Sequence, residues 1–106
     1  MAEMEEAYEV LKLICAGRGE EVASQNLRKK GYRGGSSEGL DGIDWTRWKN
    51  RFYPENATAL GHSFGGATTV EMLRHLDRFN WISQGIILDI WRQVTIPDTW
   101  AREVFV

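Results

Sequence analysis

A chain of 106 residues with 13 basic and 15 acidic side chains is long enough for one small domain and carries a formal net charge of −2. The near-neutral, mixed charge offers no basic face for nucleic acid, so no nucleic-acid partner is predicted. A single cysteine, Cys15, excludes an internal disulfide framework, and no apolar run approaches the roughly 20 residues of a membrane span.

The first 30 residues predict two helices. Residues 3–16 repeat apolar side chains at helical spacing, namely Met4, Ala7, Tyr8, Leu11 and Ile14. Cys15 falls on the apolar side of this helix and is predicted to be a small buried residue. Residues 20–30 predict a second, shorter helix, with Val22 and Leu27 as its main apolar residues and Gly31 as its stop.

Residues 31–42 are rich in glycine and serine and predict a loop. The loop lacks the G-x-x-x-x-G-K-[ST] pattern of a phosphate-binding loop, so nucleotide binding is not expected.

A short helix is then expected to extend to about residue 51, capped by Asp41 or Asp44. Its aromatic residues Trp45, Trp48 and Phe52 fall at i, i+3 and i+7. This stripe predicts packing in a core. A position in a membrane interface is the alternative.

Residues 61–66, Gly-His-Ser-Phe-Gly-Gly, place Ser63 at the centre of a G-x-S-x-G motif. The apolar-leaning residues 57–60 precede it and a helix-like run follows, as in the nucleophile elbow of α/β-hydrolases. Side chains at Gly61 and Gly65 are expected to collide with the neighbouring strand and helix. The amide of Phe64, at the helix start, is placed to stabilise an oxyanion. A glycine-rich loop with a solvated serine is the alternative.

Residues 67–76 predict a helix with one apolar face, formed by Ala67, Val70, Leu73 and Leu76. Residues 85–88 predict a buried parallel strand, with Asp89 at its carboxyl end. Because ligands and chemistry gather at that end of parallel strands, Ser63 and Asp89 are expected at one edge of one sheet, on neighbouring or nearly neighbouring strands. Residues 99–106 predict the start of a further helix or strand.

A serine nucleophile needs a general base, normally a histidine that a carboxylate orients. In α/β-hydrolases the base follows the acid in the chain, but no histidine follows Asp89. His62 is predicted to pack under the elbow rather than to act as the base. His75, about three helical turns beyond the serine, is predicted to be a surface or helix-end residue. Neither histidine has metal-ligand spacing.

The predicted fold is therefore α/β. It is a partial α/β-hydrolase fold that contains the elbow strand and helix and the following strand, preceded by helices. Residues 1–106 are interpreted as the central fragment of a single α/β-hydrolase domain. The N-terminal strands and the C-terminal part that bears the histidine are expected to be absent, because two parallel strands would leave open edges and uncovered apolar faces.

Residues 61–68, followed by Arg78-Phe79 and by Gly-Ile-Ile-Leu-Asp-Ile-Trp at 85–91, resemble the platelet-activating factor acetylhydrolase family. The similarity is to its monomeric α/β-hydrolase branch, the plasma and type II intracellular enzymes. Residues 27–32 and 34–37 are most similar to the fungal members. The resemblance extends from about Glu6 to Trp91.

The resemblance implies that Ser63 is the nucleophile, that Asp89 is the acid of the triad and that the amide of Phe64 forms half of the oxyanion hole. It also implies calcium-independent hydrolysis of a short or oxidised acyl ester at the sn-2 position of a phospholipid, through an acyl-enzyme on Ser63. No metal or organic cofactor is implied. The expected partner is the phospholipid substrate, with peripheral contact to a lipid surface.

Two other functions stay open. One alternative is a non-catalytic remnant or binding module that keeps the elbow by descent. The other is an esterase or lipase of another α/β-hydrolase branch. The position of Asp89 disfavours the other branch, since most branches place the acid one strand later. The acidic N-terminus lacks the pattern of a secretory leader, which predicts a cytoplasmic protein, or a secreted one if the N-terminus is truncated.

Overall fold

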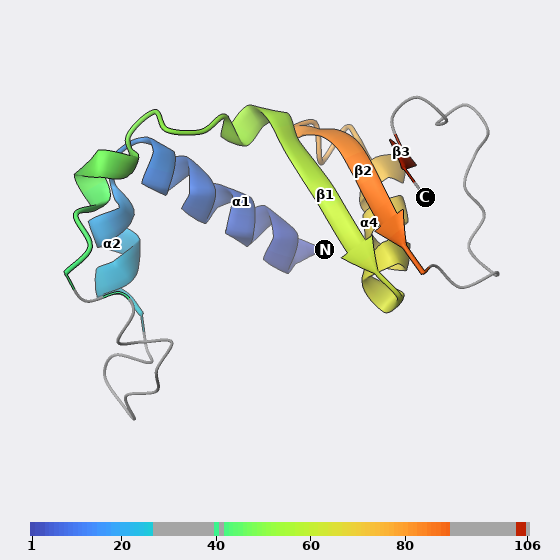
Figure 1. Cartoon of the computed structure of the whole chain (residues 1–106), viewed down its shortest axis with the longest axis horizontal. Coiled ribbons are helices and arrows are strands. Elements are labelled where there is room, and N and C mark those ends of the chain that lie inside the picture. The colour runs from blue at the N-terminus through green and yellow to red at the C-terminus, as the bar shows by residue number, and fades with distance from the viewer. Residues whose placement is uncertain (27–39, 41, 90–103, 106) are drawn as a thin grey trace. The chain divides into compact units, whose positions relative to one another are not determined.

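The structure is a computed structural model, and it describes residues 1–26, 40, 42–89 and 104–105. The chain divides into two compact units. The N-terminal unit comprises Glu3–Pro54, and the elbow unit comprises Glu55–Val106 together with Met1–Ala2. Figure 1 shows the elements of both units, and each unit is described by itself.

Two helices begin the chain. Helix α1 (Ala2–Cys15) agrees with the prediction to within one residue at each end. Helix α2 (Gly19–Ser24) is much shorter than predicted. It ends because the amides of Gln25 and Asn26 bond to the carbonyls three residues before them, which tightens the last turn. The predicted stop at Gly31 lies outside the described residues.

The apolar stripe predicted for α1 is wrong in detail. No residue of α1 is buried, and Met4 and Leu11 are exposed. The half-buried positions include Val10 and Ile14. Cys15 is also half-buried rather than buried, and its Sγ donates to the carbonyl of Phe52 at 3.2 Å. Within the described residues, no helix is both long and apolar enough to cross a membrane.

The aromatic segment forms a short 3-10 helix, η2 (Trp45–Trp48), and not an α-helix. Its cap is Asp44, whose side chain accepts from the amide of Thr46 at 3.1 Å. Because η2 ends at Trp48, the helical stripe that was predicted to bury three aromatic residues does not form. Trp45 is half-buried, but Trp48 is 47% exposed, so its predicted core position is wrong.

The elbow unit is a small α/β fold with a parallel sheet (Figure 1). After the short helix η3 (Pro54–Asn56), strand β1 (Ala57–His62) leads into helix α4 (Phe64–Arg74), and strand β2 (Ile82–Leu88) returns parallel to β1. A third strand, β3 (Val104–Phe105), pairs parallel to β2 and gives the order β1-β2-β3. The predicted strands at 57–60 and 85–88 are thus confirmed.

The core of this unit lies between α4 and one face of the sheet. Its buried side chains come from α4, from the α4–β2 connection and from β2, and they are Thr69, Val70, Met72, Leu73, Phe79, Trp81, Ile82 and Ile87. Of the predicted face of α4, Val70 and Leu73 are buried as expected. Leu76 is exposed because α4 ends two residues before it.

The opposite face of the sheet is open among the described residues. Leu60 on β1 is 62% exposed and Leu88 on β2 is 44% exposed. In Figure 1, α4 lies on one side of β1 and β2. The predicted burial of residues 85–88 therefore holds for Ile87, which faces the core, and fails for Leu88. Parallel sheets are normally covered on both faces, so among the described residues this face lacks a layer that such sheets need.

We expect the cap of η2 to depend on pH. Hydrogen bonds from the hydroxyl and then the amide of Thr46 hold the pKa of the Asp44 carboxyl below its ordinary value. A lowered folded-state pKa contributes stability above the ordinary pKa, and this contribution is lost as the pH falls through the lowered value. Thr46→Ala should raise the pKa of Asp44 in an NMR titration of its carboxyl carbon, whereas Thr68→Ala should not. An unchanged titration in Thr46→Ala would contradict this assignment.

Candidate active site

Ser63 forms the whole turn between β1 and α4. Its backbone has φ 54° and ψ −118°, a conformation that a residue with a side chain rarely adopts and that costs on the order of 1–3 kcal/mol. The Ser63 amide donates to the carbonyl of Leu88 at 3.0 Å, and its carbonyl accepts from the amide of Gly66 at 2.9 Å. The predicted sharp, strained turn from strand to helix is therefore present, and it is bonded to the end of β2.

The two flanking glycines differ in their surroundings. A Cβ at Gly61 would overlap the carbonyl of Gly65 and the Oγ1 of Thr69, so a side chain has no room there. Around Gly65, a Cβ would meet nothing within 4 Å among the described residues. The steric prediction is thus confirmed for Gly61 and wrong for Gly65. The difference arises because Gly61 faces α4, whereas Gly65 has no described neighbour on its Cβ side.

Phe64 is the first residue of α4, and its side chain is exposed. The backbone N–H groups of a first helical turn point along the helix axis, and the helix dipole places partial positive charge there. The amide of Phe64 therefore lies where an anion next to Ser63 would be favoured.

Asp89 follows the last residue of β2 and has a positive φ of 51°. The strand register pairs His62 with Leu88, so Asp89 stands one residue beyond the end of the β1–β2 pairing. Its side chain is 83% exposed. As predicted, the structure places Ser63 and Asp89 at one edge of the sheet, at the carboxyl ends of neighbouring strands.

His62 does not pack under the elbow, so that prediction is wrong. Its side chain is 67% exposed, and its Nε2 lies 3.6 Å from the Oδ2 of Asp89. The reason is the alternation of side chains along a strand: Gly61 faces α4, and His62 therefore faces the open side. This alternation was readable in the sequence once α4 was assigned to one face.

The other histidine, His75, is the C-cap of α4, and its Nε2 lies 3.1 Å from the Oε1 of Glu71. Its predicted position at a helix end on the surface is confirmed. Among the described residues, no group of three or more histidine, cysteine or acidic side chains could hold a metal ion.

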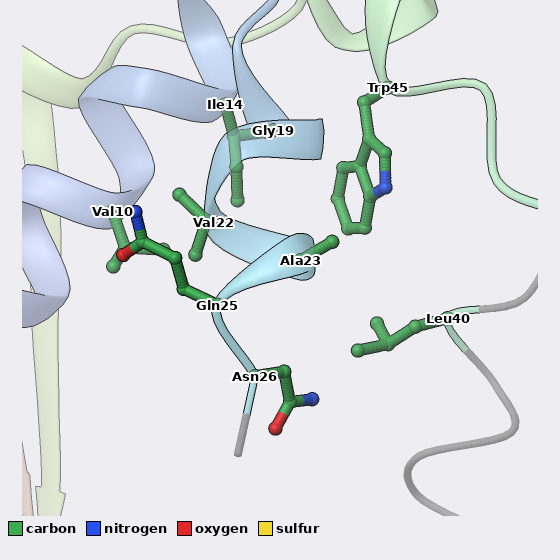
Figure 2. A pocket seen from close by; sticks show the side chains of 9 residues that line it. All are labelled: Val10, Ile14, Gly19, Val22, Ala23, Gln25, Asn26, Leu40 and Trp45. Carbon is green, nitrogen blue, oxygen red and sulfur yellow. The ribbon is translucent and has the colours of Figure 1, made fainter. Parts of the chain in front are cut away.

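The N-terminal unit contains a pocket of about 460 Å³ (Figure 2). In Figure 2 the side chain of Ala23 points toward Trp45 and Leu40, whereas Val22 lies on the other side of α2, close to Val10. The lining also includes Gln25 and Asn26, which have polar side chains. The lining includes no serine, histidine, cysteine or acidic residue, so this pocket does not carry the chemistry of the G-x-S-x-G motif.

Comparison with known proteins links these features to one family. A family model described as platelet-activating factor acetylhydrolase, isoform II, matches residues 3–98. The chain is 38% identical over 62 residues to a platelet-activating factor acetylhydrolase of Gallus gallus, a match that covers 58% of the chain and 14% of that relative. The chain thus spans a small part of the length of the curated relative that it matches. No solved structure matches the chain.

The contrast between the flanking glycines gives a stability test. Gly61→Ala should destabilise the elbow unit by about 3 kcal/mol, because the new methyl group meets backbone atoms of α4 that cannot move aside. Gly65→Ala, in open space within α4, should be neutral or stabilise by up to about 1 kcal/mol, since alanine is the better helix former. Denaturant unfolding of both variants measures the difference, and an equal loss in both would contradict the one-sided packing.

Proposed function

Because the chain belongs to the platelet-activating factor acetylhydrolase family, we propose that it is the central part of a serine esterase that hydrolyses the sn-2 acyl ester of a phospholipid. The observation that carries the proposal is the strained backbone of Ser63, held beside the end of β2 where Asp89 follows. Backbone strain of this kind clusters at active sites and ligand-binding sites. The fold we propose for the complete domain is that of an α/β-hydrolase.

In the proposed reaction, the Oγ of Ser63 attacks the carbonyl carbon of the acyl ester while a general base accepts the hydroxyl proton. The carbonyl oxygen becomes negatively charged, and the amide of Phe64 donates a hydrogen bond to it at the N-terminus of α4. The lysophospholipid leaves with the proton from the base. Water then hydrolyses the ester on Ser63 and releases the short or oxidised acyl chain.

Asp89 is the residue we propose as the acid that orients the base and stabilises its positive charge. No histidine follows it in these 106 residues. In α/β-hydrolases the base follows the acid in the chain, so in this proposal the base is neither His62, which faces Asp89, nor His75, which pairs with Glu71. We assign that role to a histidine in a segment outside the chain.

The exposed edge and face of the sheet support the same proposal, that this chain is the central part of a larger domain. β1 is an edge strand among the described residues, and Leu60 and Leu88 lie on the open face. An edge and an apolar face of this kind normally receive another strand and a helix layer. We propose that the rest of the domain supplies both.

The second candidate function is that of a non-catalytic fragment or binding module. In that case the elbow and Asp89 would be kept without a base. An esterase of another α/β-hydrolase branch would use the same residues on a different ester, and the comparison of substrates separates it from the main proposal.

Contact with a lipid surface has support from the N-terminal unit. Trp48 and Tyr53 are exposed large side chains, and basic residues at 47, 49 and 51 accompany them. Aromatic rings with adjacent cations favour the interface of a phospholipid bilayer.

Trp48→Ala is expected to weaken sedimentation with vesicles of phosphatidylcholine and phosphatidylserine by about tenfold. Leu76→Ala, at an equally exposed apolar residue, should leave it unchanged, and equal losses would contradict the proposal.

The catalytic proposal predicts that the 106-residue chain alone hydrolyses p-nitrophenyl acetate no faster than buffer does, because triad members act as a unit.

The roles of its residues can be measured in a chimera in which residues 57–89 replace the corresponding segment of the Gallus gallus relative. We expect that Ser63→Ala and Asp89→Asn each lower kcat of this chimera by about 10³-fold or more.

The control variant for these measurements is His75→Asn, which should keep the activity of the chimera. Activity that survives Ser63→Ala would contradict the assigned nucleophile. Hydrolysis by the isolated chain that Ser63→Ala abolishes would show that the base lies within these residues. A folded chimera that cleaves no acetyl ester of a phospholipid would favour the non-catalytic alternative.

A further inference from the structure

A histidine without a role in the proposed reaction faces the proposed triad acid. His62 is the last residue of β1, and its Nε2 lies 3.6 Å from the Oδ2 of Asp89. We propose that His62 is a positioning residue that holds the Asp89 carboxylate by one oxygen and leaves the other for the general base. This inference rests on the proposed function, because it assigns to Asp89 the part of the acid.

The strand register brings the two residues together. His62 pairs with Leu88, and Asp89 is the next residue along β2. Gly61 faces α4, so His62 leaves β1 on the opposite face, where it lies outside the packed core. The hydrogen bond from the Ser63 amide to the Leu88 carbonyl closes the gap between the strands at this level. Backbone pairing up to Leu88 therefore keeps His62 and Asp89 near each other.

The Asp89 side chain needs such a contact. The side chain is 83% exposed. Asp89 itself has a φ of 51° and lies beyond the last pairing of β1 with β2. An exposed side chain in this position would rotate among its staggered rotamers, and that freedom opposes any fixed orientation. Within the described part of the chain, the imidazole of His62 lies within ion-pair distance of the carboxylate, and the pair is charged when the ring is protonated.

The chemistry of the pair fits this role. A carboxylate has two oxygens and about four acceptor positions, so one oxygen can face the His62 ring while the other accepts from a general base. At 3.6 Å the contact of Nε2 with Oδ2 is longer than a hydrogen bond, and it is an ion pair when the ring carries both protons. Because the contact uses Oδ2, Oδ1 stays available. His62 would act on the reaction through Asp89, without touching the substrate.

The rotamer of Asp89 in the 106-residue chain tests the proposal. Three-bond N–Cγ and C′–Cγ couplings report the populations of its χ1 rotamers. We expect one dominant rotamer in the unaltered chain, and populations that approach about one third each in His62→Ala. His62→Lys should retain the dominant rotamer, because its ammonium group keeps a cation beside the carboxylate. The matched control, His75→Ala, removes the other exposed histidine–carboxylate pair and should leave Asp89 unchanged.

Three results would overturn the proposal: averaged Asp89 couplings in the unaltered chain, couplings that His62→Ala does not change, or an equal change in His62→Lys. Resonances of the buried Ile87 methyl groups show whether each variant keeps its fold. If His62→Ala unfolds, the reciprocal measurement decides: Asp89→Ala should average the χ1 couplings of His62, and unchanged couplings would overturn the proposal.

These couplings do not depend on catalysis, so the two proposals can fail separately. If the Asp89 rotamer depends on His62 while a chimera with Ser63→Ala stays active, the proposed function fails and the contact stands. If the rotamer is independent of His62 while Ser63→Ala and Asp89→Asn abolish activity, the positioning role alone is rejected.

Discussion

The close approach of Gly61 to the carbonyl of Gly65 is the constraint on which the elbow unit depends. The chain reverses from β1 into α4 through a single residue, so the helix must lie directly against the strand that precedes it. Only a residue without a side chain allows that approach. Ser63 bears the resulting strain of about 1–3 kcal/mol. The burial of Val70 and Ile87 offsets it, because each such side chain contributes about 1.5–3 kcal/mol when removed from water.

The same geometry brings polar residues to one edge of the sheet. A parallel strand pair ends at one edge, so the residue after each strand arrives at the same place. Ser63 follows β1 and Asp89 follows β2, and a backbone hydrogen bond between Ser63 and Leu88 keeps the two strand ends together. The edge is therefore stiff in its backbone, while the side chain of Asp89 projects into solvent and depends on its contacts for a defined direction.

One face of the sheet is also uncovered among the described residues. α4 covers one face, while Leu60 and Leu88 stay exposed on the other among the described residues. Parallel sheets bury both faces because their crossover helices come from both sides. A relative of which this chain matches only 14% has ample sequence for a second layer. The open face, the open Cβ side of Gly65 and the proposed external base all agree with a domain that extends past these residues.

The sequence alone determined the order and type of the main elements, the elbow at Ser63, the position of Asp89 after the next strand and the family. Those features follow from local periodicity, from glycine spacing and from residue order. Only the tertiary structure decided which side chains are covered: the exposure of Trp48, the open space at Gly65 and the contact between His62 and Asp89. The reason is physical, since periodicity specifies which residues share a face, whereas burial depends on whether another element, often distant in sequence, packs against that face.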